Sequence, residues 1–552
     1  MTETLEYSPY PPIDPINFDL IIVGTGLSES IISAAASAVG KTILHLDPNP
    51  FYGSHFASLS FEDLISHLNS PPKYITATAT ATTDNSDYTT VNLIQQTIFS
   101  DAEFNSCNSI EESQFLRENS RKFNLDLAGP RALFSADKTI DLLLKSGAAQ
   151  YLEFKGIDVS LVYNTNEGLV NVPDSRGAIF RDKNLSLKEK NQLMKFFKLV
   201  QQHLGGNEDE KISEEDMESS FVSYLEKLGL PSKIKAILLY AIAMVDFDQE
   251  NGGVCKDLLK TKDGIDRLAQ YSSSVGRYPN APGALLYPIY GEGELPQAFC
   301  RRAAVKGCIY VLRMPVISLL IDKVTGSYKG VRLSSGQDLY SHKLILDPSF
   351  TIPSTPSLSP KDFSLQMLSH VDIKGMVARG ICITRSSIKP DVSNCSVVYP
   401  PRSLYPDQVT SVRALQIGSN LAVCPADTFV LYFSTLCNDA NEGMKLLKAS
   451  MNALLTPPVS GNTESSPNVQ SGSEDKKPVV LWSAFYIQKL TSSKFEAISS
   501  TPTPDGNLNY VDLLDETEKL FGQMYPNEEF FPKTTSPEDT MDDDDNGIIM
   551  EN

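Results

Sequence analysis

The sequence predicts an α/β protein in which a sheet domain, built from separated parts of the chain, carries an inserted and smaller α-helical domain. Near the N-terminus, a strand over 20–23, a glycine turn, a helix over about 28–39 and a strand over 42–46 form a βαβ unit. Helical periodicity follows, and short apolar runs typical of strands come after it. A chain of 552 residues is also too long for one ordinary domain.

Three segments predict the helical zone. Ser135 is a plausible N-cap of a helix that ends before Gly147. Residues 190–206 place apolar side chains on one face and stop at a glycine pair. A third helix starts at Pro231 and carries an apolar stripe at helical spacing, made of Ile234, Ile237, Leu238, Ala241, Ile242 and Val245. Such a stripe is more often ordinary core than a ligand pocket, so we name no lipid-binding residues.

Strands are predicted wherever short apolar runs are rich in β-branched and aromatic residues. The runs lie at 316–322, 329–334, 342–350, 376–384, 428–435 and 478–490. Together with the first unit they form a discontinuous sheet domain, a pattern that fits many flavoproteins.

Composition sets the expected boundaries. The chain divides into a first part of the sheet domain (1–70), a variable insertion (71–118), a mainly helical domain (119–250), a second part of the sheet domain (251–455), a flexible linker (456–478), a C-terminal part of the sheet domain (479–531) and a disordered acidic tail (532–552). Low-complexity sequence over 77–90 falls in the insertion.

The formal net charge of -20 argues against nucleic acid as a partner, because a polyanion needs a basic face. No signal peptide and no run of eighteen apolar residues is found, and the eight cysteines form no Cys-x-x-Cys pair. We therefore expect a cytosolic chain with reduced thiols.

The glycine turn after the first strand resembles a dinucleotide site only in part. Gly24 and Gly26 occupy the first two positions of G-x-G-x-x-G, but Glu29 stands at the third. Its carboxylate would lie near a diphosphate, at a cost on the order of a few kcal/mol. Asp47, after the second strand, fits either a ribose hydroxyl or the start of a turn. We expect no bound flavin.

Sequence patterns of catalysis are not found. His-Glu-x-x-His, Gly-x-Ser-x-Gly and P-loop patterns do not occur, and the six histidines do not cluster. We expect no catalytic residues and no metal site.

Residues 23–59 and the block over 275–316, which includes "YPIYGEGELPQAF", resemble conserved regions of one family, the Rab GDP-dissociation inhibitors and Rab escort proteins. Stretches at 124–155 and 343–350 are similar to two further regions. The resemblance implies a flavoprotein-like (FAD/NAD(P)-binding) fold without cofactor, in which a platform binds Rab GTPases. Its positions here are Tyr52, Glu294, Arg301 and Tyr310. Around Tyr310 the chain departs from the family pattern.

Within that family, an inhibitor recycles prenylated Rab, whereas an escort protein presents GDP-form Rab to the α/β heterodimer of Rab geranylgeranyl transferase. Chain length, the insertion and the resemblance of 520–532 to the escort proteins' closing motif favour an escort protein. It would be a non-catalytic accessory subunit that shields the geranylgeranyl lipid and contacts membranes transiently. The alternatives are an inhibitor and a flavin oxidoreductase.

Overall fold

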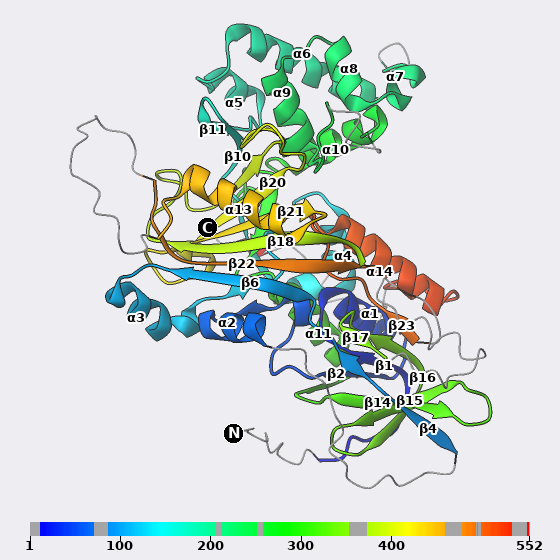
Figure 1. Cartoon of the computed structure of the whole chain (residues 1–552). Coiled ribbons are helices and arrows are strands. Elements are labelled where there is room, and N and C mark those ends of the chain that lie inside the picture. The colour runs from blue at the N-terminus through cyan, green and yellow to red at the C-terminus, as the bar shows by residue number, and fades with distance from the viewer. Residues whose placement is uncertain are drawn as a thin grey trace.

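The computed structural model of the protein describes residues 11–70, 87–205, 211–250, 258–352, 373–458, 477–492, 494, 498–532 and 549–550. Most of the predicted loops at 77–90, 456–478 and 532–552 lies outside these residues. The described elements stack in three tiers, with the helical part at the top of Figure 1 and two large sheets below it.

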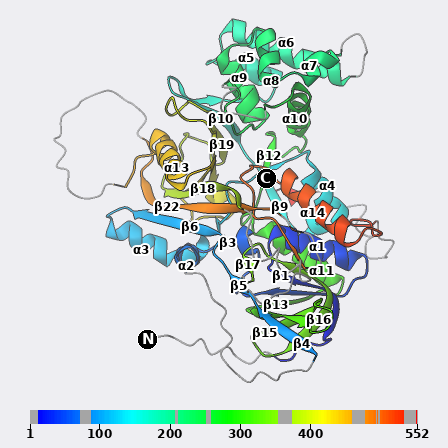
Figure 2. The same cartoon turned by 45° about the vertical axis from the view of Figure 1, so that its right-hand side comes forward.

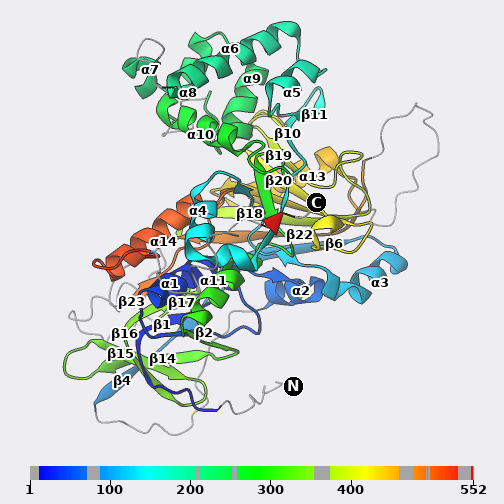
Figure 3. The same ribbon diagram turned by 180° about the vertical axis from the view of Figure 1, so that it is seen from behind.

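The first sheet contains the N-terminal βαβ unit at its centre. Its order is β13-β2-β1-β16-β15-β14-β4, and β23 pairs with β16. The parallel strands are β1 (Asn17–Val23), β2 (Ile43–Asp47), β13 (Ile309–Leu312), β16 (Asp338–Leu346) and β23 (Ile498–Ser500); the antiparallel ones are β4 (Tyr88–Asn92), β14 (Val316–Asp322) and β15 (Tyr328–Leu333). Helices α1 (Leu27–Ala38), α11 (Glu294–Val305) and α14 (Val511–Met524) cover one face. Figure 3 shows all three together.

The second sheet fills the middle tier. Its order is β11-β10-β19-β20-β21-β18-β22-β6. The bounds are β6 (Phe99–Ser106), β10 (Val159–Asn164), β11 (Gly168–Asn171), β18 (Ile373–Thr384), β19 (Cys395–Tyr399), β20 (Val412–Gly418), β21 (Phe429–Cys437) and β22 (Val480–Thr491). Helix α13 (Ala440–Leu454) covers one face, and α2 (Phe61–Asn69) and α3 (Ile110–Glu118) lie on the side of β6, as Figure 2 shows.

The top tier is helical. It contains α5 (Arg176–Arg181), α6 (Leu187–Leu204), α7 (Glu214–Glu218), α8 (Phe221–Lys227), α9 (Ser232–Ala236), the π-helix η5 (Ile237–Ile242) and α10 (Thr261–Ser274). All six members of the predicted apolar stripe are buried in one core cluster. No helix among the described residues is both long and apolar enough to cross a membrane.

A small sheet links the tiers, in the order β24-β9-β12-β8. Its strands are β8 (Leu133–Phe134), β9 (Glu153–Gly156), β12 (Leu285–Pro288) and β24 (Ile549–Met550), beside α4 (Lys138–Ser146) and η3 (Ala148–Tyr151). The remaining short elements are η1 (Ser54–Phe56), β3 (Ser58–Leu59), β5 (Ile94–Gln95), η2 (Ser120–Lys122), β7 (Leu125–Asp126), β17 (Phe350–Thr351) and η6 (Ser419–Leu421).

The predicted α/β class is confirmed, and each predicted strand and helix overlaps an observed one. One cap was wrong: Asp137, not Ser135, caps α4, because its Oδ1 accepts from the amides of Thr139 and Ile140. The Ser135 hydroxyl donates instead to the carbonyl of Ser274.

The structure also differs from the expected boundaries. Strands β9, β10 and β11 fall inside the range 119–250, and β4 and β6 of the insertion belong to the two large sheets. Helix α10 follows residue 250 but packs against α7 and α8. The sheet to which each strand belongs is decided by pairing between segments that are distant in sequence. The composition of the chain carries no information about that pairing.

Two buried arginines join separate parts of the chain. Arg379 on β18 is 1% exposed. Its guanidinium donates to the side chain of Gln488 and to three backbone carbonyls, those of Ala128, Gly129 and Asp505. Arg131 binds the Asp505 carboxylate at 2.6 Å, and its guanidinium lies over the rings of Phe56 and Tyr510, 5.3 and 5.2 Å from their centroids. The segment around Asp505 is therefore fixed to the second sheet through charged hydrogen bonds.

We expect Arg379→Met to lower the free energy of unfolding by about 3–5 kcal/mol, because it leaves several buried acceptors without a donor. Urea unfolding followed by circular dichroism measures this. Arg332→Met is the matched control, since the Arg332–Asp338 pair lies nearer the surface and should cost less than about 1 kcal/mol. Equal losses in both variants would contradict the expectation.

Candidate GTPase-binding platform and closed nucleotide turn

The glycine turn lies at the carboxyl end of β1, where an α/β sheet reverses its strand order and binds ligands. Gly24 has φ +103°, and a Cβ at this position would lie 2.5 Å from the Cβ of Asp347. The turn therefore has the tight geometry of a nucleotide-binding turn, and Gly24 is required both by its conformation and by the close approach of Asp347.

The Glu29 side chain folds back over the turn. A Cβ built on Gly26 would lie 2.5 Å from the Glu29 Oε2, and the hydroxyl of Thr501 donates to the Glu29 Oε1. The second glycine of such a motif normally lets a diphosphate approach the backbone. Here the Glu29 carboxyl group occupies the space beside Gly26 through which a diphosphate would approach.

Charges around Glu29 are balanced inside the protein. Burial, together with the Asp347 carboxylate, raises the pKa of Glu29 to about 7. Burial opposes the charged forms of His55 and Asp347, but their mutual attraction raises the pKa of His55 and lowers that of Asp347. The two form an ion pair of 3.0 Å between Nε2 and Oδ1.

Asp47 is also used internally. Its Oδ2 accepts from the amide of Thr25 at 2.9 Å and from the hydroxyls of Thr25 and Ser54, and its Oδ1 accepts from the amide of Asn49. These bonds fit the turn interpretation of Asp47 rather than a ribose contact. A dinucleotide would have to displace both Glu29 and this network, so the residues present do not fit the cofactor.

The structure brings the four predicted platform residues together. Tyr52 follows β2, Tyr310 lies on the neighbouring β13, and their rings meet edge-on at 6.2 Å. Arg301 lies near enough to Tyr52 to oppose the rise in the pKa of that phenol that burial causes. Glu294 begins α11, and Arg301 lies two turns further along the same helix face.

The two tyrosines differ in how firmly they are held. The Tyr310 hydroxyl shares a hydrogen bond of 3.0 Å with Ser33 of α1, and its ring lies 4.7 Å from that of His45. Burial raises the pKa of Tyr310 well above its usual value. Tyr310 therefore forms a partly buried floor, and the ring of Tyr52 packs edge-on against it.

Glu294 and Arg301 present charge beside this floor. Arg301 is exposed and forms no ion pair with any residue that the structure describes. Burial raises the pKa of Glu294, and Arg301 partly opposes that rise. Helical spacing also places Gln297 between them, three residues after Glu294 and four before Arg301. Sequence reasoning missed Gln297, although this spacing would have indicated it.

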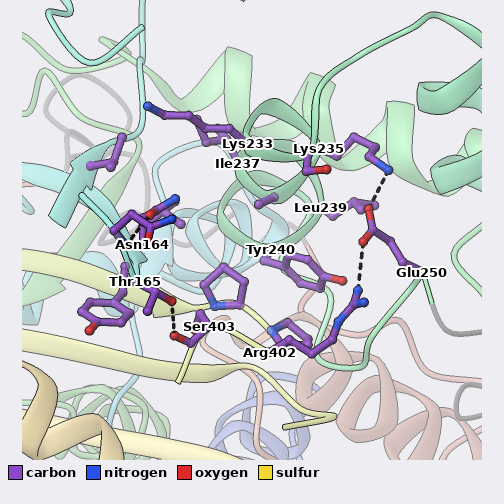
Figure 4. Close-up of a pocket in the computed structure, with 18 residues that line it drawn as sticks. Asn164, Thr165, Lys233, Lys235, Ile237, Leu239, Tyr240, Glu250, Arg402 and Ser403 are labelled. Carbon is purple, nitrogen blue, oxygen red and sulfur yellow. Dashed lines mark hydrogen bonds and ion pairs between the residues drawn. The ribbon is translucent and has the colours of Figure 1, made fainter. Parts of the chain in front are cut away.

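A cavity of about 340 Å³ lies between the helical tier and the second sheet (Figure 4). Its apolar wall comes from β10, η5 and a proline pair, with Val162, Ile237, Leu239, Tyr240, Pro400 and Pro401. Its rim is charged but paired, because Glu250 binds Lys235 at 2.6 Å and Arg402 at 2.9 Å. The cavity therefore offers an apolar interior behind a neutralised rim.

The helical tier carries an exposed apolar pair. Phe180 at the end of α5 is 62% exposed, and Leu187 at the start of α6 is 73% exposed. Residues 176–190 contain five basic and two acidic side chains in a chain of net charge -20. We call Phe180 and Leu187, with the basic side chains around them, the α5–α6 patch. Figure 1 shows α5 and α6 in the helical tier, away from α11.

No group of three or more potential His, Cys, Asp or Glu ligands is found within the described ranges.

The fold and these sites define a flavoprotein-like protein whose nucleotide turn is filled by its own side chains. The model of the family described as GDP dissociation inhibitor matches residues 15–105 and 87–462. The chain therefore belongs to the GDP dissociation inhibitor family.

Named relatives span the whole chain. Rab escort protein 1 of Arabidopsis thaliana is 54% identical, over 99% of this chain and 100% of that relative. Rab proteins geranylgeranyltransferase component A of Drosophila melanogaster is 28% identical, over 96% and 92%.

Solved structures share the fold. A Rab GDI from Plasmodium falciparum aligns with a TM-score of 0.66 at 20% identity, over 93% of this chain and 99% of that one. An oxidoreductase from Methanosarcina mazei gives a TM-score of 0.50 at 12% identity, over 93% and 100%. These likenesses confirm the flavoprotein-like fold.

We expect Glu29→Gln to be more stable than the unaltered protein above pH 7, by at most about 3 kcal/mol. The folded pKa of about 7 exceeds the usual value, so the folded state keeps a proton that the unfolded state has already released, and Glu29 costs increasing stability as pH rises towards 7. Urea unfolding of both proteins from pH 5 to pH 8 measures the difference.

Glu62→Gln, at an exposed position, controls for the loss of one negative charge. A stability difference at Glu29 that does not grow as the pH is raised would contradict the assigned burial.

Proposed function

We propose that this chain is a Rab escort protein that binds GDP-form Rab GTPases, presents them to Rab geranylgeranyl transferase and accompanies the prenylated product to membranes. The observation that carries the proposal is the platform: two tyrosines in ring contact lie near Glu294 and Arg301, and Arg301 is exposed and forms no ion pair within the described part of the chain. The names of the full-length relatives, an escort protein and components A of the transferase, support it.

The platform has the chemistry of a protein-binding site. Arg301 can make two parallel hydrogen bonds to a carboxylate, and tyrosines combine a large apolar area with a polar edge. Because α11 is packed against α1, the charged groups are presented by a rigid helix rather than by a loop. Gln297 is added to the platform on the same grounds.

The chain acts as an accessory subunit without chemistry of its own. The transferase supplies the reaction, and binding by this chain raises the local concentration of the C-terminal cysteines of Rab at that active site. The closed glycine turn supports this, since the residues that would hold a redox cofactor are bound to each other.

The lipid needs an apolar shelter after transfer. Each buried methylene is worth about 0.8 kcal/mol, so an exposed geranylgeranyl group is a large penalty. The cavity between η5 and β10 is the candidate shelter, because its wall is apolar and its rim charges are paired. The protein would be cytosolic and would reach membranes only transiently, with its cargo.

The α5–α6 patch is the candidate contact for the transferase. An exposed aromatic side chain beside aliphatic and basic groups is the kind of anchor that dominates protein interfaces. The patch lies on a different tier from the platform, so one protein can hold Rab and the transferase at the same time.

A GDP-dissociation inhibitor is the second candidate function. The family model and the Rab GDI structure favour it, since both carry that name. It would use the same platform but would not engage the transferase.

We expect Arg301→Glu to weaken binding of GDP-loaded Rab at least about tenfold, because it places a like charge opposite a carboxylate partner. Isothermal titration with a Rab protein measures the affinity. Arg181→Glu, which makes the same charge change on exposed α5, should leave it unchanged. Equal affinities for all three proteins would remove Arg301 from the platform.

We expect Phe180→Ala to weaken assembly of the Rab-bound protein with the transferase at least about tenfold while leaving Rab affinity intact. Fluorescence titration of the transferase into the preformed Rab complex measures this. Leu204→Ala, at an exposed site on the other end of α6, is the control. Loss in the control alone, or in neither variant, would place the contact elsewhere.

A further inference from the structure

The platform helix α11 begins without a capping side chain of its own. Its N-cap is Gly293, and its third residue is Pro296, which has no amide to be capped. The amides of its first two residues donate to carbonyls of the platform loop, residues 290–293, which comes just before the helix. The amides of Glu292 and Gly293 in that loop must therefore find acceptors elsewhere in the chain.

Ser58 and Asp126 supply these two acceptors. The Ser58 Oγ accepts from the amide of Gly293 at 2.8 Å. The Asp126 Oδ1 accepts from the amide of Glu292 at 3.0 Å, and it also accepts from the Ser58 hydroxyl. Because Asp126 is buried, its carboxylate and the hydroxyl beside it form an N-terminal cap that comes from another part of the chain.

Two glycines of the platform loop permit this close approach. A Cβ on Gly291, whose φ is +103°, would lie 2.5 Å from the Ser58 Oγ and 2.8 Å from the Asp126 Oδ1. A Cβ on Gly293 would lie 2.7 Å from the backbone nitrogen of Ser58. The loop therefore fits against the two capping side chains only with glycine at both positions.

A short strand pair carries both capping groups. Ser58 of β3 lies directly opposite Asp126 of β7 in an antiparallel pair. The other carboxylate oxygen of Asp126 accepts from the hydroxyl of Tyr287 on β12. The amide of Asp126 donates to the hydroxyl of Tyr432 on β21 at 3.1 Å. The cap is therefore held in place by the small sheet and by the second sheet.

The segment that carries Ser58 also carries Tyr52 of the platform. Between these two residues, the Ser54 hydroxyl donates to the carboxylate of Asp47 at 2.8 Å, beside the closed glycine turn. One fixed segment, residues 52–58, therefore has an aromatic side chain of the platform at its start. At its end lies part of the cap of the helix that carries Glu294.

We propose that Ser58 and Asp126 are positioning residues of the platform, which cap α11 from a separate strand pair and thereby hold Glu294 in place for the bound GTPase. Helix ends fray when their amides lose their acceptors, so loss of the cap would loosen the turn that carries Glu294. The inference rests on the proposed function and adds to it two residues that act through α11.

Ser58→Ala removes the acceptor of the Gly293 amide, and Ser60→Ala is its matched control. The Ser60 hydroxyl caps α2 by accepting from the amide of Asp63, so the control loses a cap of the same kind from a helix outside the platform. We expect Ser58→Ala to bind GDP-loaded Rab about three- to tenfold more weakly, and Ser60→Ala to bind it as the unaltered protein does. Isothermal titration measures the three affinities. Equal affinities, or equal losses in the two variants, would overturn the inference while leaving the platform intact.

The pH dependence of binding separates positioning from a general loss of stability. Burial raises the pKa of Asp126 to about 6, although its hydrogen bonds oppose that rise. The carboxyl group is therefore ionised at pH 7.5 and protonated at pH 5, where the negative charge at the start of α11 is lost. We expect the affinity of the unaltered protein for Rab to fall about threefold or more over this range. Asp126→Asn, which has no charge at either pH, should show a smaller fall.

Other ionisable groups face Asp126 and are common to both proteins. They are Tyr287, Glu292, Tyr432, Tyr486 and Tyr510. Burial also raises the pKa of Glu294, so the platform has a pH dependence that Asp126→Asn retains. An equal fall in the two proteins would show that Asp126 does not act on the platform.

Hydrogen exchange tests the cap without Rab. Ser58→Ala should speed amide exchange over residues 292–297, whereas Ser60→Ala should speed it only at the start of α2. Unchanged exchange over 292–297 in Ser58→Ala would overturn the inference whether or not Rab binds. If exchange changes as expected but no form of the protein binds Rab, the proposed function fails, and the role of the cap in binding fails with it.

Discussion

The contact of the Glu29 carboxyl with Gly26 and Thr501 is the interaction on which the other features depend. It closes the glycine turn from inside, and it joins the first part of the sheet domain to the last. A second bond, from the hydroxyl of Thr517 to that of Ser28, holds the same end of α1 against α14. The turn is thereby converted from a ligand site into internal packing.

Helix α1 carries this constraint to the platform. Ser28 bonds to Thr517 of α14 and Glu29 to Thr501, and one turn after Glu29 the hydroxyl of Ser33 shares a hydrogen bond with that of Tyr310. Burial of a carboxyl costs stability, and the pKa of about 7 is the sign of that cost. The platform therefore packs against a helix that is held in place by the protein's own side chains. The proposed platform for Rab on the first sheet can then be separate from the proposed lipid cavity and the proposed transferase contact, which lie nearer to or on the helical tier.

Much of the first sheet could be predicted because its signals are local. The apolar runs over 20–23 and 316–322 and the helix after the glycine turn fall where they were expected, and Glu29 could be recognised from its position alone. The partners of Glu29 could not, since Thr501 lies 472 residues away and no periodicity relates the two. The choice between Asp137 and Ser135 as the cap could not be predicted either. The Ser135 hydroxyl donates to the carbonyl of Ser274, which is distant in sequence, and Asp137 accepts the helix amide instead.

The candidate sites also divide into features with local sequence signals and features that depend on contacts between distant segments. Glu294 and Arg301 lie on one helix, so their common face could be derived from spacing, but the contact of Tyr52 with Tyr310 required the pairing of β2 with β13. The cavity joins β10, η5 and the segment around Pro400, which are distant in sequence and meet only through the second sheet. Exposure of Phe180 likewise became visible only when the helices were packed, because an apolar side chain on α5 reads as core in the sequence.

Reconstituted prenylation tests the central claim that this chain presents Rab without performing chemistry. Unmodified GDP-loaded Rab, the transferase heterodimer and geranylgeranyl diphosphate are combined with and without the protein, and lipid incorporation is followed by mass spectrometry. The account predicts incorporation only when all components are present, and none when the protein replaces the transferase. Equal incorporation with and without the protein would contradict it.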